Sequence, residues 1–263
     1  MATLDLVELA DLVRPEQLVD AIVEQNPGLP LPVPIEELAT LAGISQIECF
    51  ASEGFSGALI TNAEKSDGAI FYSSRDPRPR QRFTIGHELG HFLLPWHRQS
   101  QFNCKAQDLR YGAKSEWEIE ANRFSAELLM PRTLVMRQLQ GADAPNLSQV
   151  MKLANTFETS LEMTARRYIE LNEQPCAIVF SKDNQVRYSV RNEHFAMPLS
   201  VRKGDELPDV SESRNSIGLH NNRHEIDAHW WVRKQIEFAP TRLLFEQTVR
   251  QDNGFKITLL TWQ

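Results

Sequence analysis

The sequence predicts an α+β protein in which a mainly helical N-terminal part precedes a β-rich C-terminal part. Apolar residues recur at helical spacing in several segments between residues 3 and 172. Short β-type runs interrupt these segments between 46 and 73, and from residue 175 the spacing changes to that of paired strands. A chain of 263 residues suggests one to two domains. We expect boundaries near residues 140 and 173.

The first 75 residues are expected to hold short helices and three strands. A helical pattern covers 3–25, and Pro15 breaks or restarts it. A further helix at 35–41 is expected to end at Gly43, because glycine readily takes the left-handed conformation found after helix C-termini. The expected strands lie at 46–51, 57–61 and 69–73.

Two longer helices follow, and prolines set their ends. One covers 75–94 and stops at Pro95, and the other covers 115–130 and stops at Pro131, with a polar loop near 98–114 between them. Two shorter helices are expected at 147–157 and 160–172. This pair has helix-turn-helix proportions, but its acidic residues outnumber its basic ones. Packing against the rest of the protein is therefore favoured over contacts with DNA phosphates.

The residues after 174 predict two β-hairpins. The runs 176–180 and 186–190 flank the turn sequence Lys182-Asp-Asn184, and the runs 243–249 and 255–262 flank Asp252-Asn-Gly254. The sequence Trp230-Trp-Val232 predicts a further strand with core aromatic side chains.

The overall composition excludes several classes of protein. Lys and Arg number 28 against 35 Asp and Glu, so the formal net charge is −7 and the pI is near 5.6. This balance argues against a nucleic-acid interface and a polybasic membrane anchor. The N-terminus lacks the basic start of a signal peptide, and no apolar run approaches the ~18–20 residues of a membrane span. Three scattered cysteines offer no disulfide framework. We expect a cytoplasmic protein.

One motif carries clear chemistry, the sequence His87-Glu88-Leu-Gly-His91 within the helix at 75–94. Two histidines four residues apart lie on one face of a helix, so both imidazoles can reach one metal ion. Glu88 lies next to this face, where it can hold a water molecule and act as the general base of a zinc peptidase. The apolar flanks of the motif argue against two incidental surface histidines.

A catalytic zinc needs a third protein ligand, and the helix at 115–130 offers several carboxylates. Spacing alone does not choose between Glu118 and Glu120. Glu118 also has a purely structural interpretation, because Ser115-x-x-Glu118 is a capping-box pattern. Asn122 favours Glu118, since it follows four residues later on the same face, where its side chain can hold a ligand histidine.

The two helices together resemble the ImmA/IrrE family of metallo-endopeptidases. Residues 82–94 read Arg-Phe-Thr-Ile-Gly-His-Glu-Leu-Gly-His-Phe-Leu-Leu, and residues 118–131 read Glu-Ile-Glu-Ala-Asn-Arg-Phe-Ser-Ala-Glu-Leu-Leu-Met-Pro. The resemblance covers about 30–172. Ser125 departs mildly from the family, which usually has Ala there.

The resemblance implies His87, His91 and Glu118 as zinc ligands and Glu88 as the catalytic base. It implies a zincin-like metallopeptidase domain over 1–140. The sequence further predicts a helix-turn-helix-like segment over 141–173 and a β-rich domain over 174–263, for which sensing, substrate recognition and structural support stay open. Family members cleave helix-turn-helix repressors of stress, phage or mobile-element genes. We therefore expect a repressor protein as the substrate, Zn²⁺ as the cofactor with Mn²⁺ as the alternative, and neither nucleic acid nor a membrane as a partner.

The expected reaction is hydrolysis of a peptide bond. Zinc would polarise the scissile carbonyl and acidify its water, while Glu88 would move the proton to the leaving amine. An extended substrate is expected to pair with 69–73 as an edge strand. Candidates for a second oxyanion donor are Tyr72, His97 and Tyr111.

The alternative function is that of a non-catalytic antirepressor or sensor, which keeps the scaffold and acts by binding its partner. The intact Glu88 argues against it, because a binding module needs no general base. His220, His224 and His229 form a further cluster in the sequence, but their spacing does not favour a second metal site.

Overall fold

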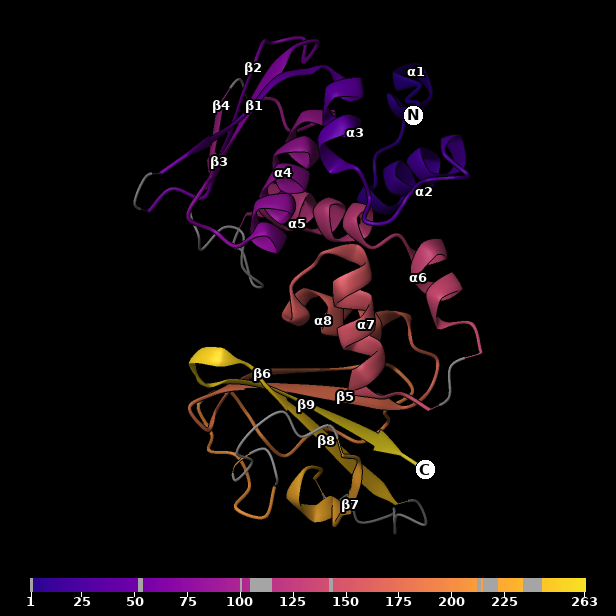
Figure 1. Cartoon of the computed structure of the whole chain (residues 1–263), viewed down its shortest axis with the longest axis vertical. Coiled ribbons are helices and arrows are strands. Elements are labelled where there is room, and N and C mark those ends of the chain that lie inside the picture. Colours follow the sequence, from indigo (N-terminus) through magenta and orange to yellow (C-terminus); the bar gives the residue numbers. More distant parts are fainter. Residues whose placement is uncertain are drawn as a thin grey trace. The chain divides into compact units, whose positions relative to one another are not determined.

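The computed structural model describes residues 2–51, 54–99, 101–104, 115–141, 144–211, 214, 222–233 and 243–263. The chain forms two compact units (Figure 1). Unit 1 comprises 1–135 and 155–160, and unit 2 comprises 136–154 and 161–263. Within the described residues, no helix is long and apolar enough to cross a membrane. The division into three functional parts at 140 and 173 stays a prediction.

Unit 1 contains a small mixed sheet. Its strands are β1 (Ile44–Phe50), β2 (Gly57–Thr61), β3 (Gly68–Ser73) and β4 (Gln101–Cys104). They lie in the order β1-β3-β2-β4, with β1 parallel to β3 and the other pairs antiparallel. The three strands predicted from the sequence are confirmed.

β4 was not predicted, because the sequence around it is polar and short and was interpreted as a loop. It forms because Phe102, which is buried, pairs with Leu59 of β2 in the sheet register. The prediction that 69–73 is an edge strand is wrong, since β3 lies between β1 and β2. A strand paired on both sides has no backbone groups left for a substrate.

Three helices precede the first strand. They are α1 (Leu6–Leu9), α2 (Pro15–Gln25) and α3 (Ile35–Ala42). Pro15 occupies the first turn of α2, where its missing N–H costs no hydrogen bond. Gly43 ends α3 with φ of +111°, as expected for a glycine after a helix.

The predicted long helices are α4 (Arg78–Leu93) and α5 (Glu116–Leu129), and they pack closely on one another. Glycines make this approach possible. A Cβ on Gly86 would lie 2.6 Å from Ser125 Oγ, and one on Gly90 would lie 3.0 Å from Phe124 Cδ1. Ser125 uses the space well, because its hydroxyl donates to the Phe83 carbonyl at 2.8 Å. The helix pair also packs against the sheet, since α4 contacts β2 and β3.

The remaining helices are α6 (Arg132–Leu139), α7 (Leu147–Phe157) and α8 (Leu161–Leu171). The last two match the predicted pair closely. α6 was not predicted, because Pro131 was interpreted only as a stop, whereas it also opens the following helix by accepting from Leu134 and Val135. Asn155–Ser160, which comprises the end of α7 and the turn before α8, belongs to unit 1.

Unit 2 is built on a five-stranded antiparallel sheet. Its strands are β5 (Cys176–Lys182), β6 (Gln185–Arg191), β7 (His224–Ile226), β8 (Leu244–Arg250) and β9 (Phe255–Trp262), in the order β6-β5-β9-β8-β7. Both predicted hairpins are present. Asp183 and Asn184 have φ of 50° and 65°, which suits the tight turn between β5 and β6.

The strand predicted at 230–232 is wrong. Ala228–Trp230 forms a 3₁₀ helix, η1, and only Val232 makes a β-bridge, to Leu199. Trp231 is nevertheless a core residue and is fully buried. The apolar side chains of residues 230–232 favoured a strand in the sequence. A single large side chain such as Trp231 can be buried equally well when it lies next to a helical turn.

Candidate metal centre

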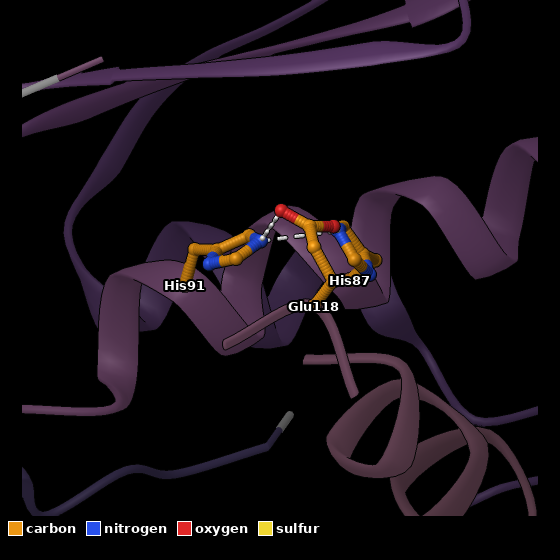
Figure 2. Close-up of side chains that lie close together, drawn as sticks. All are labelled: His87, His91 and Glu118. Atoms are coloured by element: carbon orange, nitrogen blue, oxygen red, sulfur yellow. Dashed lines mark hydrogen bonds and ion pairs between the residues drawn. The ribbon is translucent and has the colours of Figure 1, made fainter. Parts of the chain in front are cut away.

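α4 and α5 bring three predicted side chains together (Figure 2). His87 and His91 lie one turn apart on α4 and are fully buried, while Glu118 reaches them from the first turn of α5. One potential ligand atom from each residue lies within 4.8 Å of the other two. Among the described residues, this is the one group of three or more His, Cys, Asp or Glu side chains that is arranged in this way.

The distances within this cluster suit a single metal ion. His87 Nε2 lies 3.1 Å from His91 Nε2 and 3.1 Å from Glu118 Oε2, and His91 Nε2 lies 3.5 Å from Glu118 Oε1. Ligands about 2.1 Å from a tetrahedral zinc ion are separated from one another by about 3.4 Å. The three residues therefore fit a metal site with a fourth position left for water or substrate.

The structure separates the two glutamates that spacing left open. Glu118 turns to the histidines, whereas Glu120 binds Trp96 and His97. The capping-box interpretation of Glu118 loses its basis, because Ser115 makes no side-chain hydrogen bond to the start of α5.

Electrostatics give the cluster the protonation states of metal ligands. Burial lowers the pKa of His91 to about 4, so the ring is neutral near pH 7. Burial alone would raise the pKa of Glu118, but its close contacts with His87 and His91 outweigh burial and lower the pKa well below its usual range. A neutral imidazole and an ionised carboxylate bind a divalent ion without first losing a proton.

Each histidine is also held from behind. His87 Nδ1 lies 3.1 Å from Asn122 Oδ1, which is the contact that the sequence spacing predicted. Since this oxygen only accepts, His87 carries its proton on Nδ1 and has the lone pair of Nε2 directed to the cluster.

His97 was missed as a partner of the cluster. Its Nδ1 lies 2.9 Å from His91 Nδ1, and its Nε2 lies 2.9 Å from Glu120 Oε2. The proposed oxyanion role for His97 is therefore wrong, because both ring nitrogens are engaged and the residue is fully buried. Sequence spacing gives no signal for this contact, since Pro95 breaks the helical register between His91 and His97.

Glu88 is fully buried beside β2. A Cβ on Gly57 would lie 2.7 Å from Glu88 Oε1 and even closer to Thr84 Cγ2. Only a glycine at this place in the strand lets the carboxylate lie there. Gly57 and Glu88 thus fit one another, although they lie 31 positions apart in the sequence.

The other candidates lie elsewhere. Tyr72 is next to Cys49, and its pKa is raised by burial first and then by that thiol. Tyr111 and His220 lie outside the described residues. His224 is on β7, and His229 is on η1, where it pairs with Asp227 at 2.7 Å.

Comparison with known proteins supports the resemblance seen in the sequence. The sequence profile of the IrrE N-terminal-like domain, Peptidase_M78, matches residues 52–168. This match assigns residues 52–168, less than half of the chain, to an IrrE N-terminal-like domain. The match includes both helices of the cluster, so the predicted resemblance is confirmed over this range.

Several solved structures also match this chain. A transcriptional regulator of Mycobacterium tuberculosis has 12% sequence identity and a TM-score of 0.49, with 98% of this chain and 73% of that chain covered. A comparison with curated proteins found no match.

Proposed function

We propose that this protein is a zinc-dependent endopeptidase with a zincin-like fold, in which His87, His91 and Glu118 bind the metal. The observation that carries the proposal is the convergence of these three side chains within an IrrE N-terminal-like domain. Two imidazoles and one carboxylate are the donor set of several zinc peptidases. Mn²⁺ is the alternative ion, because the same donors also suit it.

Glu88 supplies the acid–base chemistry in this proposal. When bound, the metal would polarise the scissile carbonyl and make a bound water acidic near neutral pH. Glu88, one residue after His87 on α4, accepts a proton from water and passes it to the leaving amine. Its burial beside Gly57 holds the carboxylate in place and keeps bulk water from it.

The substrate is proposed to bind along β4 rather than β3. β4 is at one end of the strand order, so one of its sides has no partner strand among the described residues. Phe102 of β4 stacks on the ring of His91, with centroids 4.2 Å apart. An extended peptide added to this edge would therefore run past the metal cluster.

The proposed substrate is a helix-turn-helix transcriptional repressor whose cleavage switches on stress, phage or mobile-element genes. Resemblance to the ImmA/IrrE family supports this choice of substrate. The proposal includes a cytoplasmic location, where such repressors bind their operators. It also assigns the residues after 174 to recognition of the repressor or of an activating signal.

The test uses the full-length zinc-loaded protein and any small helix-turn-helix protein that a gene adjacent to its own encodes. The wild type is expected to cut this repressor. Glu88→Gln is expected to lower the rate by about 10²–10⁴-fold, because a general base contributes that much. Its metal content should stay equal to that of the wild type. Cleavage products are followed by mass spectrometry.

A normal rate for Glu88→Gln would overturn the proposed mechanism. Tight binding of the repressor without cleavage by the metal-loaded wild type would instead support the antirepressor function.

A further inference from the structure

His91 has a second contact network on the side away from the metal cluster. Its Nε2 faces Glu118 and His87, whereas its Nδ1 faces His97 Nδ1 at 2.9 Å. His97 in turn presents Nε2 to Glu120 Oε2 at 2.9 Å. A continuous chain of hydrogen bonds therefore runs from Glu120 through His97 to a metal ligand.

The chemistry of Glu120, His97 and His91 fixes which group donates and which accepts in each of these hydrogen bonds. An ionised carboxylate only accepts hydrogen bonds, so His97 must carry its proton on Nε2 and donate it to Glu120. The other ring nitrogen, His97 Nδ1, then has a lone pair and accepts. His91 must therefore donate from Nδ1, which leaves its Nε2 with the lone pair that a metal ion requires.

Packing keeps the rings in this arrangement. His91 and His97 are fully buried. The His97 ring stacks on Trp117, with centroids 5.2 Å apart and an interplanar angle of 22°, and the His91 ring stacks on Phe102. The indole N–H of Trp96 donates to the same Glu120 oxygen at 2.7 Å, which holds the carboxylate beside His97.

Two other acceptors compete for the proton of His91. His87 Nε2 lies 3.1 Å and Glu118 Oε1 lies 3.5 Å from His91 Nε2, so a tautomer with the proton on Nε2 would point it at these two groups. The contact with His97, at 2.9 Å, is shorter than both, and it is linked to a second carboxylate. The geometry thus favours the tautomer with a free Nε2 before any metal arrives.

We propose that Glu120 and His97 are positioning residues that fix the tautomer and orientation of His91 for metal binding. The proposal rests on the metal centre of the proposed function and extends it to two residues that do not contact the ion. Loss of a partner behind a ligand histidine typically weakens metal affinity by about 10–100-fold.

The first experiment needs no metal. The protonated ring nitrogen of each histidine is read from long-range ¹H–¹⁵N NMR spectra of the metal-free full-length protein at mildly alkaline pH. In the wild type, His91 is expected to be protonated on Nδ1 and unprotonated on Nε2. In His97→Leu, it is expected to move toward the opposite tautomer, with Glu118 as the acceptor.

The second experiment measures Zn²⁺ affinity by competition with a chromophoric chelator. His97→Leu and Glu120→Leu are expected to bind Zn²⁺ about 10–100-fold more weakly than the wild type. His97→Asn is the matched rescue variant, because Asn Oδ1 occupies the place of His Nδ1 and still accepts from His91. Its Zn²⁺ affinity should stay within a few-fold of the wild-type value, and so should that of the packing control Trp117→Phe.

These readouts separate positioning from a general effect on folding. Wild-type affinity in His97→Leu, or an equal loss in His97→Asn and His97→Leu, would overturn the proposal. So would a wild-type His91 protonated on Nε2. If the wild type binds no Zn²⁺, the proposed function fails, while the tautomers of the metal-free protein still decide the role of His97. If His97→Leu does not fold, His97→Asn and Glu120→Leu carry the same comparison.

Discussion

Each unit holds a carboxylate among polar side chains, but the two carboxylates are satisfied in opposite ways. In unit 2, Glu246 is fully buried, and its two oxygens accept from Ser211 Oγ at 2.6 Å and Trp231 Nε1 at 2.7 Å. In unit 1, Glu118 instead faces His87 and His91, whose metal-binding nitrogens point to the same place. Neutral donors satisfy a buried carboxylate by themselves, whereas converging lone pairs need a cation. The difference predicts a structural role for Glu246 and a metal-binding role for Glu118.

Replacing each of the two glutamates, Glu118 and Glu246, by Gln gives the sharpest test of this difference. Glu118→Gln is expected to weaken Zn²⁺ binding by more than the roughly 10–100-fold that a partner behind a ligand contributes, because it removes a charged ligand atom. Bound metal per chain and Zn²⁺ affinity are measured. Glu116→Gln on the exposed start of the same helix is the control and should bind normally. Unchanged zinc content in Glu118→Gln would remove Glu118 from the site.

The fit between Glu88 and β2 predicts the next largest effect. Gly57→Ala places a methyl group against the Glu88 carboxylate, and a displacement of about 1 Å in a catalytic group costs on the order of 10²-fold in rate. We expect cleavage to fall about 10–100-fold, with Zn²⁺ affinity unchanged. Gly28→Ala is the control, since its Cβ would meet nothing within 4 Å. Full activity in Gly57→Ala would show that the strand does not position Glu88.

Glu246→Gln should alter stability and leave the metal centre alone. The amide of Gln cannot accept from both Ser211 and Trp231, so one buried donor loses its partner at a cost of about 1–3 kcal/mol. Chemical denaturation followed by Trp fluorescence measures the loss, and chelator competition measures Zn²⁺ affinity. A fall in Zn²⁺ affinity for this variant would contradict the division of roles between the two carboxylates.

The smallest expected effect concerns the reactivity of thiols. Cys176 at the start of β5 is fully buried, and burial raises its pKa to about 12, so almost no thiolate forms at neutral pH. Cys49 on β1 is exposed. In a Cys104→Ser background, iodoacetamide should label Cys49 first and Cys176 only when the sheet of unit 2 opens. Mass spectrometry measures the labelling rate of each cysteine. Equal rates for Cys49 and Cys176 would show that unit 2 is open in the native state.

Local signals in the sequence predicted much of the fold. Apolar spacing located α4, α5, α7 and α8, and the Asp183-Asn184 turn located the hairpin of β5 and β6. The sequence does not predict β4 and α6, and it assigns Trp231 to the wrong kind of element. A distant partner strand decided the outcome for β4, a proline with two roles decided it for α6, and burial of a single side chain decided it for Trp231. Apolar periodicity reports none of these causes.

The sequence by itself determined the facing pair His87 and His91, because a spacing of four residues on a helix fixes one face. It also determined the neighbouring position of Glu88 and the contact of Asn122. Only the tertiary structure decided between Glu118 and Glu120, placed β3 inside its sheet and put His97 behind His91. Helical periodicity is a property of one segment, whereas these outcomes depend on how α5, β4 and the turn after α4 pack together.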